Sequence, residues 1–170
     1  EAIELQKKNP KKIMMDVYTN WCGPCKMLDR NTFQNTDVAK YVNENYYAVK
    51  FNAEGNDKVT YKGKTYSNPN YNPELKNRRN SPHELSRYFQ VQAYPTIVFM
   101  DEKAELIAPI RGYQTPPQLE LYLKMFKNDD HKNIIEMAKI TNGGGTTRVL
   151  EELGFDTYYQ QSNCLHLYWW

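Results

Sequence analysis

Two cysteines three residues apart are the residues of this 170-residue sequence best suited to chemistry. Cys22 and Cys25 enclose Gly23-Pro24 and follow an apolar, β-branched and aromatic run at 12–19. That pattern is typical of a buried strand that enters a turn and then a helix. A helix begins with unpaired N–H groups and a partial positive charge, which favour a thiolate at Cys22. Because Cys25 follows by about one helical turn, it can resolve a mixed disulfide formed at Cys22. The spacing therefore predicts thiol–disulfide exchange.

A carboxylate lies inside the same predicted strand. Asp16 stands within the largely apolar stretch 14–18, six residues before Cys22. Burial would raise the pKa of Asp16, and an acid with a raised pKa beneath a thiol pair can exchange protons with it. The period-two alternation of a strand allows a second interpretation, in which Asp16 lies on a solvated face. The offset of Asp16 from the cysteines favours the buried acid.

Helical and extended patterns alternate as far as residue 127. Helices are predicted at 1–8, 25–29, 36–45, 81–89 and 115–127, and strands at 12–19, 46–52, 94–101 and 106–111. The last two strands are close enough to form an antiparallel hairpin. This alternation predicts an α/β or α+β fold.

The ends of these helices carry recognisable signals. The helix at 25–29 is expected to be interrupted near 31–35, and Asn35 or Thr36 to cap the next helix. Ser81, followed by Pro82, is expected to cap the helix at 81–89. This places His83 in the first turn, as a surface residue.

The domain organisation is read from changes in composition. Residues 1–127 are predicted to form one domain, with an insertion at 55–80 that is dense in Gly, Asn and Pro and contains a short hairpin around Lys62-Gly63. Residues 128–170 are predicted to be a C-terminal extension. Within it, helices are expected at 134–140 and 147–153, a glycine joint at 143–145 and an aromatic tail at 158–170.

The composition excludes several classes of protein. Hydrophobic residues make up 40% and charged residues 25% of the chain, as in soluble globular proteins. No apolar run approaches the roughly 20 residues of a membrane-spanning helix. The formal charge of +2 implies no polyanionic partner. The chain begins at Glu1 without Met or an apolar leader, so any export signal would be invisible here.

The insertion is the most basic segment of the chain. Its six cations outnumber its two acids and are interleaved with tyrosines, a pattern that could bind an acidic partner or RNA. A solvated basic loop is the favoured interpretation, because no nucleic-acid-binding motif accompanies it. No nucleic acid is therefore predicted as a partner.

A zinc site is the main rival to redox chemistry. Cys22 and Cys25 could form half of such a site, with Cys164 and His166 supplying the other ligands. Gly-Pro between the first two cysteines, at a strand-to-helix turn, favours redox chemistry instead. We therefore predict no metal and no cofactor, and interpret Cys164 as a packed thiol.

The motif Trp21-Cys22-Gly23-Pro24-Cys25-Lys26, with Asp16 upstream, resembles the active-site segment of thioredoxin. Three further positions match that family: Tyr94-Pro95-Thr96 resembles its cis-proline segment, Lys50 its lysine near the buried aspartate, and Gly112 the glycine before its last helix. The likeness covers 1–54 and 81–127. Within it, residues 27–42 resemble the thioredoxin-fold domains of exported reductant-relay proteins of the disulfide-interchange type.

The resemblance implies a thioredoxin-like fold, with a central mixed sheet flanked by helices. It implies that Cys22 is an exposed nucleophile, that Cys25 is a shielded resolving thiol, and that Asp16 and Lys50 assist them. It further implies a groove that receives the extended chain of a substrate, bordered by Trp21, Tyr94, cis Pro95 and Gly112. The sequence departs from the family in the bulk of Tyr94, in Tyr18 at a tryptophan position, and in the insertion.

The predicted function is that of a thiol–disulfide oxidoreductase, specifically a protein-disulfide reductase, because Gly-Pro between the cysteines resembles the reducing members of the family. The predicted partners are disulfide-bearing protein substrates and an upstream electron donor. The predicted location is the bacterial periplasm or another exported compartment, with the cytoplasm as the alternative. The alternative function is a non-catalytic binding module that presents the insertion and tail to a partner. The intact Cys-Gly-Pro-Cys, Asp16 and Pro95 favour the enzyme.

Overall fold

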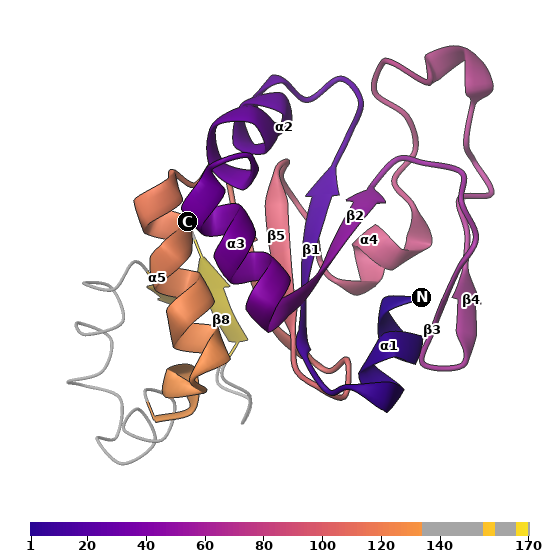
Figure 1. The fold of residues 1–170 in the computed structure, drawn as a ribbon. Helices are drawn as coiled ribbons and strands as arrows, with labels where there is room; N and C mark the ends of the chain where they lie inside the picture. The colour runs from indigo at the N-terminus through magenta and orange to yellow at the C-terminus, as the bar shows by residue number, and fades with distance from the viewer. Residues whose placement is uncertain (134–154, 159–165, 170) are drawn as a thin grey trace.

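A mixed sheet of four strands forms the centre of the molecule, in the order β2-β1-β5-β6 (Figure 1). Strands β1 (Lys12–Tyr18) and β2 (Tyr46–Asn52) are parallel. Strand β5 (Thr96–Met100) is antiparallel to both β1 and β6 (Leu106–Arg111). This confirms the predicted mixed sheet and its final hairpin. The strand predicted to start at residue 94 begins later, at Thr96, after the Tyr94–Pro95 segment.

The structure is a computed structural model that describes residues 1–133, 155–158 and 166–169. The helices that accompany the sheet are α1 (Ala2–Lys8), α2 (Gly23–Leu28), α3 (Thr36–Asn45), α4 (Glu84–Tyr88) and α5 (Pro116–Lys127). Figure 1 shows α3 and α5 on one side of the sheet and α1 and α4 on the other. The fold is therefore the predicted sheet flanked by helices.

Strand β1 is buried on both faces, which explains its almost continuous apolar sequence. Met14 packs into a core with residues of α2, α3 and α5, whereas Ile13, Met15 and Val17 pack into a second core with residues of α1 and α4. Because side chains alternate along a strand, Asp16 lies on the same face as Met14. Its face is thus covered by helices, and the solvated alternative for Asp16 is wrong.

The first helix of the redox segment runs further than expected. Helix α2 continues directly into a π-helical turn, η1 (Asp29–Phe33), and the predicted break before α3 falls at 34–35. Thr32 in that turn is fully buried, and its Oγ1 donates a hydrogen bond to the carbonyl of Gln114. This long-range contact stabilises the turn. Asn35 then caps α3, as predicted, by accepting the N–H groups of Asp37 and Val38.

The start of α4 differs from the prediction. His83, and not Ser81, is the N-cap, and its Nδ1 accepts the N–H of Leu85 at 3.0 Å. Ser81 Oγ instead donates to Asn68 in the insertion. His83 is fully buried, so its assignment to the surface is also wrong. The reason is that the insertion covers it, since Nε2 of His83 lies 2.7 Å from the carbonyl oxygen of Asp57.

The insertion contributes to the core through its hairpin. Strands β3 (Val59–Tyr61) and β4 (Lys64–Tyr66) are antiparallel, and Lys62 and Gly63 form the turn with positive φ angles. Tyr61 and Tyr66 are buried in the second core, so the interpretation of the insertion as a solvated loop is wrong for these two tyrosines. The chain then forms a single 3₁₀ turn, η2 (Pro73–Leu75).

Beyond the sheet, the structure describes one further pairing. Strands β7 (Phe155–Tyr158) and β8 (His166–Trp169) are antiparallel, an element that the sequence pattern did not indicate. The helices predicted at 134–140 and 147–153 and the glycine joint at 143–145 lie outside the described residues. Among the helices that are described, none is long and apolar enough to cross a membrane.

We expect His83→Ala to lower the free energy of unfolding by about 2 to 4 kcal/mol, because it removes a helix cap, leaves the Asp57 carbonyl unpaired and opens a cavity beside Phe51. Urea unfolding followed by circular dichroism measures the loss. His83→Asn retains a capping side chain and should lose less. The control is Arg87→Ala on the exposed side of the same helix. If both alanine variants lost the same stability, the structural role of His83 would be wrong.

Candidate redox site

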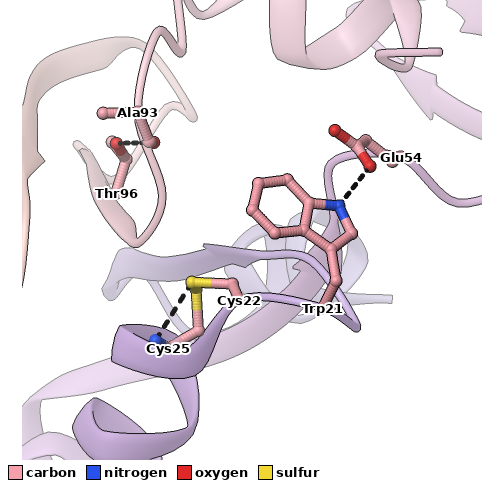
Figure 2. Close-up of a disulfide and its surroundings, with 6 residues drawn as sticks. All are labelled: Trp21, Cys22, Cys25, Glu54, Ala93 and Thr96. Atoms are coloured by element: carbon pink, nitrogen blue, oxygen red, sulfur yellow. Dashed lines mark hydrogen bonds between the residues drawn. A yellow bond between two sulfur atoms is a disulfide. The ribbon is translucent and has the colours of Figure 1, made fainter. Parts of the chain in front are cut away.

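The two cysteines lie at the junction of β1 and α2. Cys22 is the N-cap of α2, and Pro24 occupies its first turn, where a missing N–H costs nothing. A disulfide joins Cys22 to Cys25, with their Cα atoms 5.3 Å apart. The N–H of Cys25 donates to Cys22 Sγ at 3.1 Å (Figure 2). The sulfur of Cys22 thus takes the place of the usual capping oxygen.

Both cysteines are covered in this oxidised form. The exposed fraction is 2% for Cys22 and 4% for Cys25. The implied exposure of Cys22 is therefore wrong for the disulfide state. The reason is local, because the sulfur of Cys22 is bonded to Cys25 and accepts its N–H, so that it faces the helix. Shielding of Cys25 agrees with what the resemblance implies.

Asp16 is buried on the central strand, and burial raises its pKa to about 6 from the ordinary 3.8. The positive charge of Lys50 opposes this increase in pKa, and the negative charge of Asp29 adds to it. Asp16 Oδ1 is buried and has no hydrogen-bond partner among the described residues. Such a carboxylate can hold or release a proton near neutral pH.

Lys50 occupies the position on β2 directly opposite Asp16 on β1. Its ammonium group, however, forms an ion pair with Asp29 of η1 at 2.9 Å, and it lies over the ring of Tyr18. Lys50 is about half exposed. It therefore links β2 to η1, and it acts on Asp16 through its charge.

Trp21 is held by groups from three separate segments. Its Nε1 donates to Glu54 Oε2 at 2.7 Å (Figure 2), and its ring meets that of Tyr94 edge to face at 5.9 Å. The guanidinium of Arg79, in the insertion, lies 5.0 Å from the Trp21 ring centroid. Sequence reasoning missed Glu54. The available signal was an acid just beyond the end of β2, the parallel neighbour of the active-site strand.

The remaining residues of the predicted groove are also brought together. The Tyr94–Pro95 peptide bond is cis, and the carbonyl of Pro95 accepts the N–H of Gly112 at 2.8 Å. Gly112 has a φ of +82°, a conformation that favours glycine. Figure 2 shows the turn between Ala93 and Thr96 dipping toward the disulfide, closed by a hydrogen bond from Thr96 Oγ1 to Ala93.

The rival zinc site would need Cys22, Cys25, Cys164 and His166 together. No group of three or more His, Cys, Asp or Glu side chains among the described residues could hold a metal ion. Cys164 lies outside the described part of the chain. The pair Cys22–Cys25 is instead occupied in bonding to itself.

A family model described as a thioredoxin-like domain matches residues 1–127. The chain belongs to this family. The described fold agrees with that membership, and Cys22 and Cys25 lie within the matched residues, at the start of α2. The match ends at the last residue of α5.

Individual relatives are distant. The thiol:disulfide interchange protein DsbD of Pectobacterium atrosepticum is 23% identical over 121 residues, which cover 70% of this chain but only 17% of that protein. A thioredoxin-fold protein from Helicobacter pylori has a TM-score of 0.54 at 20% identity, covering 73% of both chains. A thioredoxin from Thermus thermophilus has a TM-score of 0.52 at 16% identity, covering 74% of this chain and 80% of its own. These two structures share the fold.

The family and the geometry of the cysteine pair make this chain a thiol–disulfide oxidoreductase. The two sulfurs bond within one helical turn, and one of them receives a backbone N–H at a helix start. An N–H donor and the positive end of a helix stabilise a thiolate there when the disulfide opens.

We expect Asp16→Asn to stabilise the oxidised protein at pH 8. The pKa of Asp16 rises from 3.8 to about 6 on folding, so the native state binds more protons than the unfolded state between these values. Stability is therefore lost as the pH rises through 6, by about 3 kcal/mol at about 1.4 kcal/mol per pKa unit. Urea unfolding of both forms at pH 8 and pH 3 measures the difference, which should vanish at pH 3.

Asp130→Asn, at an exposed position, is the matched control and should change stability little at either pH. A gain from Asp16→Asn that did not depend on pH would contradict an ionised, buried Asp16.

Proposed function

We propose that this chain is a protein-disulfide reductase that acts on disulfide-bearing protein substrates. The observation that carries the proposal is the sulfur of Cys22 at the start of α2, bonded to Cys25 and accepting a backbone N–H. The bonded pair is the product of the proposed reaction. Its precursor is the dithiol, in which the same N–H and the helix dipole favour the thiolate of Cys22.

The reaction proceeds in two exchanges. The Cys22 thiolate attacks one sulfur of the substrate disulfide, and the other substrate sulfur leaves as a thiolate that takes up a proton. The Cys25 thiolate then attacks Cys22 Sγ, which forms the Cys22–Cys25 disulfide and releases the second substrate thiol. Two electrons pass from the dithiol to the substrate. A dithiol donor must reverse these steps to restore the pair.

Asp16 accepts the proton of Cys25 in the second exchange. Its burial, its pKa of about 6 and its unpaired Oδ1 support this role, because an ionised carboxylate at neutral pH can accept a proton. Asp16 also faces the side of the sheet that α2 and α3 cover. Lys50 limits the increase in the pKa of Asp16 through its positive charge.

The substrate lies in an extended conformation beside the disulfide. Trp21 and Tyr94 form an aromatic wall, and the Pro95–Gly112 contact forms a neighbouring edge. An extended substrate chain can lie along this edge while its cysteine faces Cys22. The bulk of Tyr94 narrows the range of side chains that fit beside that cysteine.

The relatives support a proposal for the partners and the location. The curated relative is a thiol:disulfide interchange protein, which supports protein disulfides as substrates and a second thiol protein as electron donor. We place the chain in the bacterial periplasm, where protein disulfides persist and a reductant must be supplied. Residues 1–127 act as the catalytic domain, and 128–170 as an extension.

Cys22→Ser should abolish reduction of insulin by the dithiothreitol-reduced protein, since it removes the nucleophile. Cys25→Ser should retain the first exchange and accumulate mixed disulfides on Cys22, because nothing resolves them. Turbidity of insulin measures turnover, and non-reducing gels with mass spectrometry of periplasmic extracts identify the trapped proteins.

Cys22→Ser/Cys25→Ser is the control and should trap nothing. If wild type did not reduce insulin and Cys25→Ser captured no protein in cells, the proposed reductase function would be overturned.

A further inference from the structure

The redox site has a positively charged rim that the insertion supplies. Lys76, Arg78 and Arg79 follow the 3₁₀ turn η2 and are all exposed. Figure 1 shows this turn at the same end of the sheet as α2. The guanidinium of Arg79 lies over the ring of Trp21, the residue before Cys22. We call these three cations the basic rim.

The backbone of the basic rim is fixed to the redox segment. Asn20 Nδ2 donates to the carbonyl of Lys76 at 2.9 Å, and the N–H of Asn80 donates to Glu54 Oε2 at 2.9 Å. The same oxygen of Glu54 accepts the N–H of the Trp21 ring. The basic rim therefore lies at a defined distance from the disulfide, which distinguishes it from a loop that moves independently.

The cations of the basic rim have no carboxylate partner of their own in the described part of the chain. The ion pairs there join other residues, and Glu54, the nearby acid, is occupied by Trp21 and Asn80. Glu54 keeps its negative charge, because its two donors are neutral N–H groups, and Glu74 of η2 adds a second negative charge. The three cations still leave a net positive charge beside the Trp21 ring, and this creates a local positive potential. That potential attracts anionic groups to the site.

We propose that the basic rim binds acidic residues of the protein substrate, next to the disulfide that Cys22 attacks. This inference rests on the proposed reductase function and names its substrate class. The occupant is a protein, because the rim adjoins a sulfur pair whose reaction requires a disulfide. Acidic side chains match the charge of the rim and can pair with the two guanidinium groups.

The effect should appear mainly in the rate of encounter. Electrostatic steering accelerates association by roughly 10-fold or more at low ionic strength, and salt screens it within a Debye length of about 8 Å at 0.15 M. The charge of the rim acts on the Cys22 thiolate equally for every substrate, so a difference in rate between substrates reports their encounter with the site. The rim therefore selects among substrates by how often each one reaches Cys22. The exchange reaction at Cys22 is the same for every substrate.

Two synthetic peptides with one intramolecular disulfide test the proposal. They are identical except that the residues flanking the disulfide are Glu in one and Gln in the other. The pre-reduced protein, freed of dithiothreitol, is mixed with each peptide, and acid-quenched samples are separated by chromatography. We expect the Glu peptide to react about 5- to 20-fold faster at low salt, and the advantage to shrink at high salt.

Lys76→Gln/Arg78→Gln should bring the ratio of the two rates close to one. Arg79 is left in place in this variant, so that the contact with Trp21 is kept. The matched control is Lys8→Gln/Lys103→Gln, which removes two exposed cations from the opposite end of the sheet and should keep the ratio.

Each outcome has a separate meaning. Equal rates for the two peptides at low salt, with both reduced, would overturn the basic rim as a binding surface and leave the reductase standing. Failure to reduce either peptide would overturn the reductase function itself. If the control variant lowered the ratio of the two rates as much as Lys76→Gln/Arg78→Gln did, the effect would come from net charge. The basic rim would then be overturned as a binding surface. Tighter binding of a short RNA than of the Glu peptide would assign the rim to nucleic acid.

Discussion

The hydrogen bond from the N–H of Cys25 to the sulfur of Cys22 is the interaction on which the site depends. It exists because β1 ends where α2 begins, with only a short turn between them. Strand β1 is paired on both sides, and Leu28 anchors α2 in the core that Met14 shares. The sheet therefore fixes the position of the sulfur at the helix start, and the chemistry needs no movement of the strand.

The central strand β1 leads into the redox segment, and it also contains a buried carboxylate that lowers the stability of the fold. An apolar residue in place of Asp16 would suit its buried position, yet the carboxylate stands there with one oxygen unpaired. Burial favours the protonated acid, and the charge of Lys50 on the neighbouring strand limits that preference. The two opposing effects leave the pKa of Asp16 near the pH at which thiols exchange. The buried carboxylate therefore lowers stability at the position where we propose that it accepts a proton.

Local patterns in the sequence were enough to predict the sheet, most helices and the redox pair. The run before Cys22, the hairpin turn at Lys62-Gly63 and the capping Asn35 depend on neighbouring residues only, so spacing reveals them. The misassigned features depend on contacts distant in sequence. His83 is buried because the insertion covers it, and Glu54 belongs to the site because Trp21 reaches it. No periodicity encodes such contacts.

The insertion changes what the family's fold can discriminate without altering its reaction. Trp21 is held by Glu54 beyond β2, by Tyr94 before β5 and by Arg79 in the insertion. The first two contacts come from segments that adjoin strands of the sheet, and they fix the ring. The third adds a charge that the sheet does not supply. A charge placed there acts on the Cys22 thiolate in the same way for every substrate, so a difference between substrates arises from access. Evolution of the insertion could therefore change the substrates while the redox pair stayed the same.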